Sequence, residues 1–463
     1  PPPPPPRVGG GGFFFFYIFF FFFFFVLWPP PPPRGGGARA PPTPSRAMSH
    51  QSRSGAKRRK IAVGDDPLLR AFLNQYAGCA VPDHGNPPQI DRVRYASLDA
   101  DAFETKYVLG RRPVILTDAL SDESDLAGAN MWTNAFLRDA CGGDASTSRV
   151  ESRDEGANER FGRGKYKSMT FDAFMDKYEA RDGGWYLSAG GKAEPFAAPG
   201  RLLASETAKS SKGKLPLRPK GVPRSLVPAD VNLWMGRNST STSSGLHHDY
   251  HDNLYVLVRG EKTFKVFSPR DAGRMYTTGK ICWVHENGLI NYKGASTLQD
   301  GDVALATGES ALEFRLRKAR GDEDEDEPAI GSSDDDFADF DGVDDYDELN
   351  QTPEPSDDDS AEEEKRKDDD DEEDPPSFSR IDYDRLDEFP LFKTASAMEF
   401  TVKAGEALYL PTGWFHDVSS RDAGEGHVAF NYWFHPPPLG EAWEGRRALW
   451  EEDFQRSVLP KFQ

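Results

Sequence analysis

The sequence predicts a mainly β fold, a sandwich or barrel with flanking helices and a disordered acidic insertion. Several short runs between residues 229 and 436 have strand composition and are separated by Gly, Pro and Asp turns. Such a series is typical of sandwiches and barrels rather than of alternating β/α units. An Asp- and Glu-rich block at residues 318–377 interrupts the series. These observations divide the chain into a leader, a supporting region, two barrel halves and a C-terminal helix.

Residues 1–66 form a leader of low complexity, with homopolymer tracts of Pro, Gly and Phe before residue 47, and we predict that it is disordered. The apolar block Phe13–Trp28 is just short of the roughly 17–25 residues that span a bilayer, and it lacks a small-residue cleavage site. We expect Met48 to begin the native product, so that residues 1–47 lie outside it. A membrane anchor within residues 13–28 is the alternative.

The basic run Lys57–Lys60 and the cysteines bear on location. A basic tetrad can act as a nuclear address or as a nucleic-acid contact, although a solvated disordered leader explains it at least as well. Cys79, Cys141 and Cys282 lie far apart, which argues against a disulfide framework or a cysteine zinc site and suits a reducing compartment. We therefore expect the protein in the cytoplasm or the nucleus.

Residues 67–228 have the composition of a supporting α/β region. Helical spacing of apolar residues, or a Thr start followed by a Gly stop, predicts helices at Leu68–Tyr76, Trp132–Cys141 and Phe171–Tyr178. Short β-branched or aromatic runs predict a buried strand at Arg112–Asp118 and another beginning at Trp185. Residues 198–227 are rich in Pro, Lys and Gly, and we expect a surface loop there.

The barrel itself is expected in two halves, residues 229–317 and 378–436. The predicted strands are Ala229–Gly236, Asn253–Val258, Glu261–Phe267, Glu399–Val402, Ala407–Leu410 and Val428–Phe434. Residues 437–463 are expected to form a helix with an apolar stripe of Trp443, Leu449, Trp450 and Phe454. This stripe predicts packing on the core or against a second copy, so a homodimer through the helix is among the expected assemblies.

The acidic block dominates the charge of the chain. Asp322–Asp374 holds 29 acidic and three basic residues, a net charge of −26, whereas the whole chain has −20. The block has few aliphatic residues and cannot bury enough surface to fold, so we expect a disordered loop, either merely solvated or bound to a basic partner. The first sixty residues are basic, and the rest of the chain is close to neutral. Global charge therefore gives no information about partners, and we expect no direct nucleic-acid binding.

Polar residues with metal-ligand character gather at His247–Asp252, just before a predicted strand. His247 and Asp249 are two residues apart, so on an extended strand they point to the same face. A triad of two histidines and one carboxylate leaves coordination positions open and marks non-haem Fe(II) oxygenases. His416 is the best third ligand, because Trp414 and Phe415 hold it against the core; His427, His435 and His285 have weaker surroundings.

Neighbouring residues receive structural interpretations. His248 lies between the two ligands and must face away from the metal, on the surface or behind the ligands. His251 is expected to pack rather than to contact substrate, and Asp252 to form hydrogen bonds in a turn or behind the metal ligands. Trp234 is interpreted as a core residue.

Three separate stretches, HHDYHDNLYVLVRGEKTFKVFSP, GEALYLPTGWFHDV and AFNYWF, together resemble the jumonji-C (JmjC) domain. The resemblance covers roughly residues 118–434 apart from the acidic insertion. It implies a double-stranded β-helix, the cupin or jelly-roll barrel, and a dioxygenase that depends on Fe(II) and 2-oxoglutarate. Within the family the chain is most similar to the small protein-hydroxylase branch, in particular a lysyl hydroxylase of a GTPase. The implied substrate is therefore a protein side chain, lysine first.

The resemblance also assigns residues. It places the metal ligands on His247, Asp249 and His416, and the lysine that binds 2-oxoglutarate on Lys262. A cation suits that position, because the far carboxylate of 2-oxoglutarate must be paired once it is desolvated. Four further matches are implied around the metal and the co-substrate: Asn253, Asn431, Tyr186, whose hydroxyl would reach the distal carboxylate, and Ser244, where threonine is more frequent.

Three other functions stay open at this point. The same domain removes methyl groups from histone lysines in other members, but no cysteine-rich chromatin-reading module accompanies it here, which favours hydroxylation. A cupin-like binding protein without catalysis is a second alternative, against which the complete triad argues. A zinc or manganese cupin isomerase is a third, since oxygen and nitrogen ligands do not fix the metal.

Overall fold

The computed structural model describes residues 74–81, 89–143, 147–152, 165–181, 184–190, 198–204, 212–237, 242–293, 297–298, 300–305, 309–321, 375–421, 424, 426–439 and 443–462. The predicted leader, its apolar block and basic run, and residues 322–374 of the acidic insertion lie outside these ranges. Within the described residues no helix is long and apolar enough to cross a membrane.

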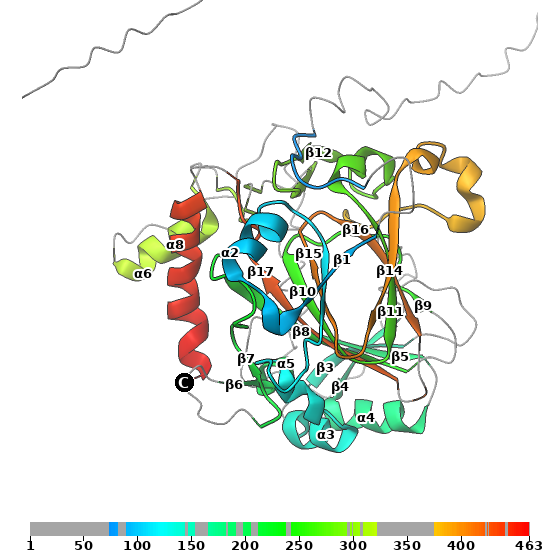
Figure 1. Cartoon of the computed structure of the whole chain (residues 1–463), viewed down its shortest axis with the longest axis vertical. Helices are drawn as coiled ribbons and strands as arrows, with labels where there is room; N and C mark the ends of the chain where they lie inside the picture. Colours follow the sequence, from blue (N-terminus) through cyan, green and yellow to red (C-terminus); the bar gives the residue numbers. More distant parts are fainter. Residues whose placement is uncertain are drawn as a thin grey trace, which may run out of the picture. The chain divides into compact units, whose positions relative to one another are not determined.

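Eight strands build the barrel, four in each of two facing sheets (Figure 1). One sheet contains β8 (Pro228–Gly236), β17 (His427–Phe434), β10 (Asp252–Arg259) and β15 (Ala407–Leu410), and the other contains β9 (Thr242–Ser243), β16 (Phe415–Arg421), β11 (Glu261–Phe267) and β14 (Ala397–Lys403). Within each half, β8–β11 and β14–β17, successive strands enter opposite sheets, and β11 and β14 pair with each other where the halves meet, which is the arrangement of a double-stranded β-helix. The predicted fold is confirmed.

The first sheet extends beyond the barrel on both sides, to nine strands in all. β1 (Asp91–Arg94) and β2 (Val114–Thr117) continue it past β15, and β5 (Trp185–Ala189), β3 (Thr147–Ser152) and β4 (Lys165–Thr170) continue it past β8. The residues expected at 67–228 therefore supply strands to the same sheet as the barrel. Short parallel strands β6 (Leu203–Ala204) and β7 (Leu215–Pro216) interrupt the expected surface loop.

The two longer helices of the supporting region each begin after a threonine whose side chain caps the helix. α3 (Asn134–Cys141) begins after Thr133, whose side chain accepts a hydrogen bond from the Phe136 backbone, and it ends at Gly142 as predicted. α4 (Phe171–Ala180) is capped by Thr170 and ends at Arg181 in the left-handed conformation. α2 (Ala100–Phe103) and α5 (Ala198–Arg201) are single turns. The helix expected at residues 68–76 is partly outside the described residues, and Asn74–Tyr76 are not helical.

Three elements between β11 and β14 were not expected. β12 (Ile281–Val284) pairs with β13 (Ile290–Tyr292), and α6 (Ala311–Arg320) begins with a Ser310–Glu313 capping box and ends at Gly321. The first residues of the expected insertion, 318–320, belong to α6, and the described chain resumes at Pro375, 22 residues before β14.

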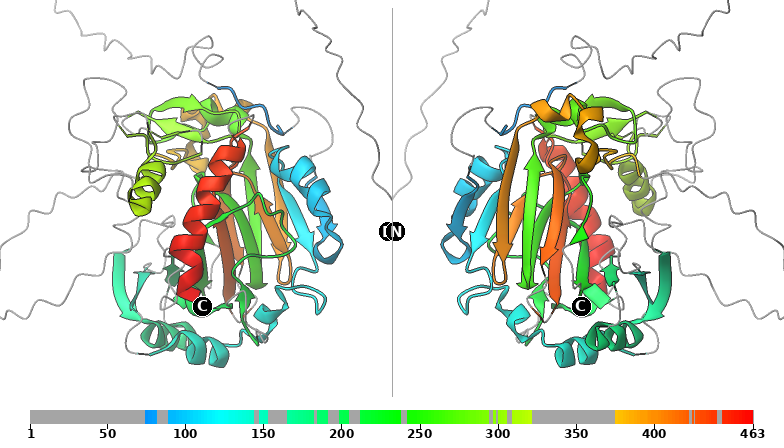
Figure 2. Two further views of the ribbon diagram at one scale, coloured as in Figure 1. Left: turned by 90° about the vertical axis from the view of Figure 1, so that its left-hand side faces the viewer. Right: turned by 90° about the vertical axis from the view of Figure 1, so that its right-hand side faces the viewer.

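The C-terminal helix α8 (Trp443–Asp453) crosses the outer face of the large sheet and continues in a π-helical turn, Phe454–Val458 (Figure 2). Trp450 and Phe454 are buried in the main core, and Trp450 stacks on His435 at a centroid distance of 4.9 Å. Residues 449–454 of the apolar stripe therefore pack on their own chain. The expected homodimer through this helix loses support, because the rings of Trp450 and Phe454 are already covered.

Candidate metal and co-substrate site

The segment that carries His247 runs beside the first residues of β16. The backbone N–H of His247 donates to His416 O at 3.1 Å, and the N–H of His416 donates to His247 O at 2.7 Å. On its other side His247 bridges Phe378. The prediction that His247 and Asp249 share a regular strand is wrong, since both lie in the extended connection between β9 and β10. Pairing with two neighbouring segments nevertheless fixes this connection.

The three predicted ligands converge at one point. Ligand atoms of His247, Asp249 and His416 all lie within 4.8 Å of one another. Asp249 Oδ1 is 4.0 Å from His247 Nε2, and its Oδ2 is 3.5 Å from His416 Nε2. The backbone carbonyl of Asp249 accepts hydrogen bonds from Thr412 Oγ1 and Gly413 N, both at 3.0 Å. The carboxylate is therefore held on a backbone that the β15–β16 turn fixes.

Both imidazoles present the same nitrogen to the carboxylate. His247 Nδ1 lies 2.9 Å from Gly245 O, and His416 Nδ1 lies 2.9 Å from Trp414 O. A carbonyl accepts only, so each Nδ1 carries the proton and each Nε2 keeps its lone pair for a metal. Burial lowers the pKa of His247 from 6.5 to about 4, which keeps this imidazole neutral at pH 7.

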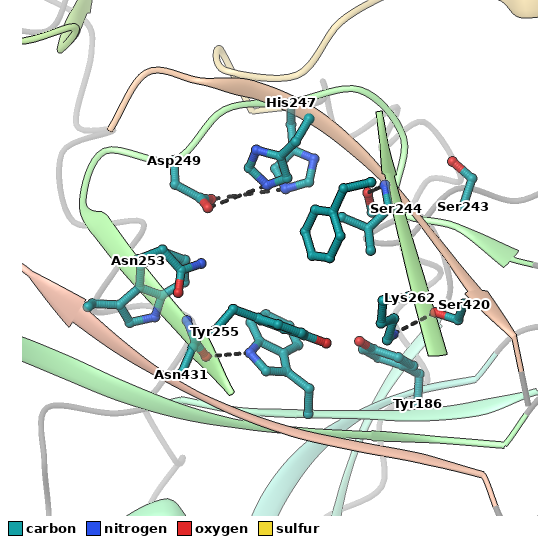
Figure 3. Close-up of a pocket in the computed structure, with 15 residues that line it drawn as sticks. Tyr186, Ser243, Ser244, His247, Asp249, Asn253, Tyr255, Lys262, Ser420 and Asn431 are labelled. Carbon is teal, nitrogen blue, oxygen red and sulfur yellow. Dashed lines mark hydrogen bonds and ion pairs between the residues drawn. The ribbon is translucent and has the colours of Figure 1, made fainter. Parts of the chain in front are cut away.

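A cavity of about 110 Å³ connects the triad to Lys262 on β11. The Lys262 side chain is 2% exposed, its Nζ donates to Ser420 Oγ at 2.5 Å, and it lies 5.8 Å from the Tyr186 ring centroid. Figure 3 shows Lys262, Ser420 and Tyr186 at one end of the cavity and His247 with Asp249 at the other. A buried ammonium facing a small cavity favours an anionic occupant.

Two asparagines line the cavity between these ends. Asn431 Oδ1 accepts a hydrogen bond from Trp234 Nε1 at 2.5 Å (Figure 3). Because an indole N–H only donates, this bond fixes the amide orientation and leaves Asn431 Nδ2 as a buried donor with no partner among the described residues. Asn253 Oδ1 is likewise buried and unpaired. Buried polar groups are nearly always satisfied, so these two atoms indicate a missing polar occupant.

A comparison with protein families adds to this geometry. The model of the cupin-like domain family matches residues 100–440, about three quarters of the chain. The chain belongs to the cupin-like JmjC family. JmjC domain-containing protein 4 of Schizosaccharomyces pombe is 29% identical over 435 residues, which cover 79% of this chain and 88% of that relative.

Two further JmjC relatives match about half of the chain. Lysine-specific demethylase JMJ32 of Arabidopsis thaliana is 30% identical over 209 residues, and Bifunctional peptidase and (3S)-lysyl hydroxylase JMJD7 of Homo sapiens is 24% identical over 208 residues. Each match covers 45% of this chain and 42% of the relative. JmjC proteins are in general oxygenases that use Fe(II) and 2-oxoglutarate.

The residues of this JmjC domain fit both Fe(II) and 2-oxoglutarate. Two imidazoles and one carboxylate are a donor set for Fe(II) that leaves positions open. The unpaired donor of Asn431 and acceptor of Asn253 lie between the triad and Lys262, where a small dicarboxylate would meet them. Among the described residues, the triad is the one group of His, Cys, Asp or Glu side chains arranged to hold a metal.

Tyr186 and Ser244, which the family resemblance assigned to the co-substrate, also line the cavity. Tyr186 is 9% exposed and lies against Trp234, with ring centroids 6.2 Å apart. Ser244 Oγ accepts from Val418 N at 2.9 Å and donates to Gly245 O at 3.0 Å. Their expected contacts with 2-oxoglutarate stay predictions. Trp234 was interpreted as core only, which is wrong, because it lines the cavity and orients Asn431.

Sequence reasoning missed part of the wall. His416, Val418 and Ser420 alternate along β16 and all line the cavity, as do Lys262 and Phe264 on β11. Period-two spacing from His416 would have pointed to Ser420, but β16 was not predicted as a strand. The missed lining residues on other elements are Ser243, Tyr255 and Trp433.

Of the other polar residues in the segment His247–Asp252, His248 and Asp252 are buried and His251 is half-buried. Asp252 and Arg111 are both 0% exposed and form a two-point ion pair at 2.5 and 2.9 Å. His248 was expected on the surface or behind the ligands; it is buried, with Nε2 2.7 Å from Tyr292 Oη. His251 packs near Trp433, with ring centroids 6.2 Å apart. These contacts support the backbone on which Asp249 sits.

Proposed function

We propose that this protein is an Fe(II)- and 2-oxoglutarate-dependent dioxygenase that hydroxylates a protein side chain, with lysine the favoured target. The observation that carries the proposal is the shared cavity. The metal-ligand triad lies at one end, the buried cation of Lys262 lies at the other, and unpaired amide atoms of Asn253 and Asn431 lie between them.

Each residue would have a defined task. His247, Asp249 and His416 hold Fe(II), which when bound supplies open coordination positions and the redox chemistry for C–H hydroxylation. Lys262 pairs with the distal carboxylate of 2-oxoglutarate, and Asn431 Nδ2 donates to an oxygen of the co-substrate.

The walls and the mouth of the cavity suit this assignment. Apolar side chains of Tyr255, Phe264 and Val418 exclude water from the space between the ends. The side chains of His247 and Asp249 are 15% and 23% exposed, so the metal end is the open end. A substrate side chain can therefore approach the metal while the co-substrate occupies the buried end.

Lysine is favoured by two relatives whose names describe lysine chemistry, a lysine-specific demethylase and a (3S)-lysyl hydroxylase. Because these names describe opposite outcomes, demethylation of a lysine is the alternative. Product mass separates the two, since hydroxylation adds one oxygen and demethylation removes a methyl group. A lysine-rich peptide library, half of it methylated, incubated with the protein, Fe(II) and 2-oxoglutarate, would show which change occurs.

Succinate release tests the proposed chemistry without knowledge of the substrate. We expect slow, Fe(II)-dependent conversion of 2-oxoglutarate to succinate by the purified chain, and its loss in His416→Ala and in Asp249→Ala. His285→Ala is the matched control, because His285 does not line the cavity. Turnover retained in His416→Ala would refute the ligand assignment, and no turnover in the native protein would favour a binding protein of the same fold.

A further inference from the structure

One aromatic ring outside the ligand set stacks on a proposed ligand. The rings of Phe378 and His247 lie 4.8 Å apart between centroids, with an angle of 12° between their planes. The two residues are also partners in a backbone bridge, and bridged residues carry their side chains on the same face. Since Gly245 O holds one edge of the His247 ring, Phe378 covers a face that the hydrogen bond leaves unrestrained.

The backbone that carries Phe378 is held on two sides. His248 N donates to Ser377 O at 3.4 Å, and Ser379 N donates to Leu246 O at 2.8 Å, so this segment runs along the one that carries His247. Thr278 N donates to Phe378 O at 2.8 Å from the other side. Ser377 and Ser379 are buried on either side of the half-buried Phe378. A fixed backbone therefore presents the ring to His247.

His247 thus has a neighbour on each side of its backbone. His416 pairs with one side, and Phe378 pairs with the other. The second of these neighbours lies close in sequence to the acidic run, because Phe378 follows its last residue, Asp374, by only four positions. Phe378, in the first described segment after residue 374, therefore lies directly beside a proposed metal ligand.

We propose that Phe378 is a positioning residue for the metal site. By stacking on His247 it keeps Nε2 of that imidazole directed toward Asp249 and His416, and it thereby raises the affinity for a divalent metal. The inference rests on the proposed function, because it requires the triad to bind metal. A phenylalanine that only fills space would leave the metal affinity unchanged when its ring is removed.

Titration of Co(II) into the metal-free full chain, followed by visible absorption, tests this role without catalysis. Phe378→Tyr keeps the stacked ring and should bind Co(II) within about twofold of the native protein. Phe378→Leu and Phe378→Ala should bind about three- to tenfold more weakly. Tyr383→Ala is the matched control. Tyr383 is an exposed aromatic residue five positions after Phe378 whose ring lies against Phe392, so the affinity for Co(II) should be unchanged in this variant.

The outcomes are distinguishable. If the native protein binds no Co(II), the proposed function fails and the inference with it. If the native protein and Phe378→Leu bind Co(II) equally, the inference is overturned while the proposed function stands, and a lowered thermal unfolding midpoint in that variant would then assign the ring a packing role only. At saturating Co(II), the affinity for 2-oxoglutarate should be unchanged in Phe378→Leu, since Lys262 and Asn431 are untouched. Should Phe378→Ala fail to fold, Phe378→Leu decides, because it keeps apolar volume at the position.

Discussion

Replacing Lys262 by methionine removes the buried cation and keeps an unbranched side chain that is one atom shorter. If Lys262 pairs with the distal carboxylate of 2-oxoglutarate, the variant leaves that carboxylate uncompensated in a site where Lys262 is 2% and Ser420 6% exposed. Breaking a buried, hydrogen-bonded charge pair costs about 3 kcal/mol or more. Since about 1.4 kcal/mol corresponds to a factor of ten, the KM for 2-oxoglutarate should rise roughly 150-fold.

The rate at saturating co-substrate should fall much less. Lys262 would hold the end of 2-oxoglutarate that does not react, and an interaction made equally in ground and transition states changes KM rather than kcat. Co(II) affinity should be unchanged, because the Lys262 partner Ser420 follows His416 by four residues, about 13 Å along β16. A purified Lys262→Met protein, assayed for succinate across a range of 2-oxoglutarate concentrations, gives both parameters.

A KM within threefold of the native value would refute the reasoning, provided that Co(II) binding is intact. Loss of Co(II) binding together with a changed KM would also refute it, because it would mean that Lys262 supports the fold of the triad rather than the co-substrate. Lys262→Arg separates charge from shape, since it keeps the cation in a larger head group and should recover part of the affinity.

Three further predictions test other parts of the account. Trp234→Phe removes the indole N–H that orients Asn431, so the KM for 2-oxoglutarate should rise several-fold at unchanged Co(II) affinity, measured as above. Arg111→Met leaves the carboxylate of Asp252 buried and unpaired, and urea unfolding should show a loss of about 3–5 kcal/mol, whereas an exposed pair would show less than about 1 kcal/mol. Burial against the C-terminal helix lowers the pKa of His435 from 6.5 to about 3, so its stabilising contribution is present above pH 6.5 and is lost as the pH falls toward 3. His435→Gln should therefore reduce the loss of stability between pH 7 and 5 by about 1–2 kcal/mol, and an unchanged pH dependence would contradict the lowered pKa of His435.

The barrel was predictable because most of its strands alternate or are continuously apolar, and the resemblance ordered them. β16 was not predicted as a strand, because its sequence, FHDVSSR, is mostly polar. Two of the three residues on its cavity face, His416 and Ser420, are polar and suited to holding ligands rather than to filling a core. Hydrophobic periodicity identifies strands that bury apolar side chains, and it fails where one face lines a polar site.

Contacts between residues far apart in sequence also could not be predicted. Asp252 looked like a turn or supporting residue, but its ion-pair partner Arg111 is 141 positions away, and no spacing rule connects them. Trp234 looked like core because an indole usually is, and its role depends on the register between β8 and β17. The triad and Lys262 were identified from short motifs, whereas the contacts that orient them require the fold.

Anomalous diffraction from crystals soaked anaerobically with Fe(II) and 2-oxoglutarate tests the central claim most directly, namely that the triad and Lys262 form one site. The account predicts one strong iron peak bound by His247 Nε2, Asp249 and His416 Nε2, and density for 2-oxoglutarate that runs from the iron to Lys262 Nζ. Iron bound elsewhere, or 2-oxoglutarate bound without contact to Lys262, would contradict it.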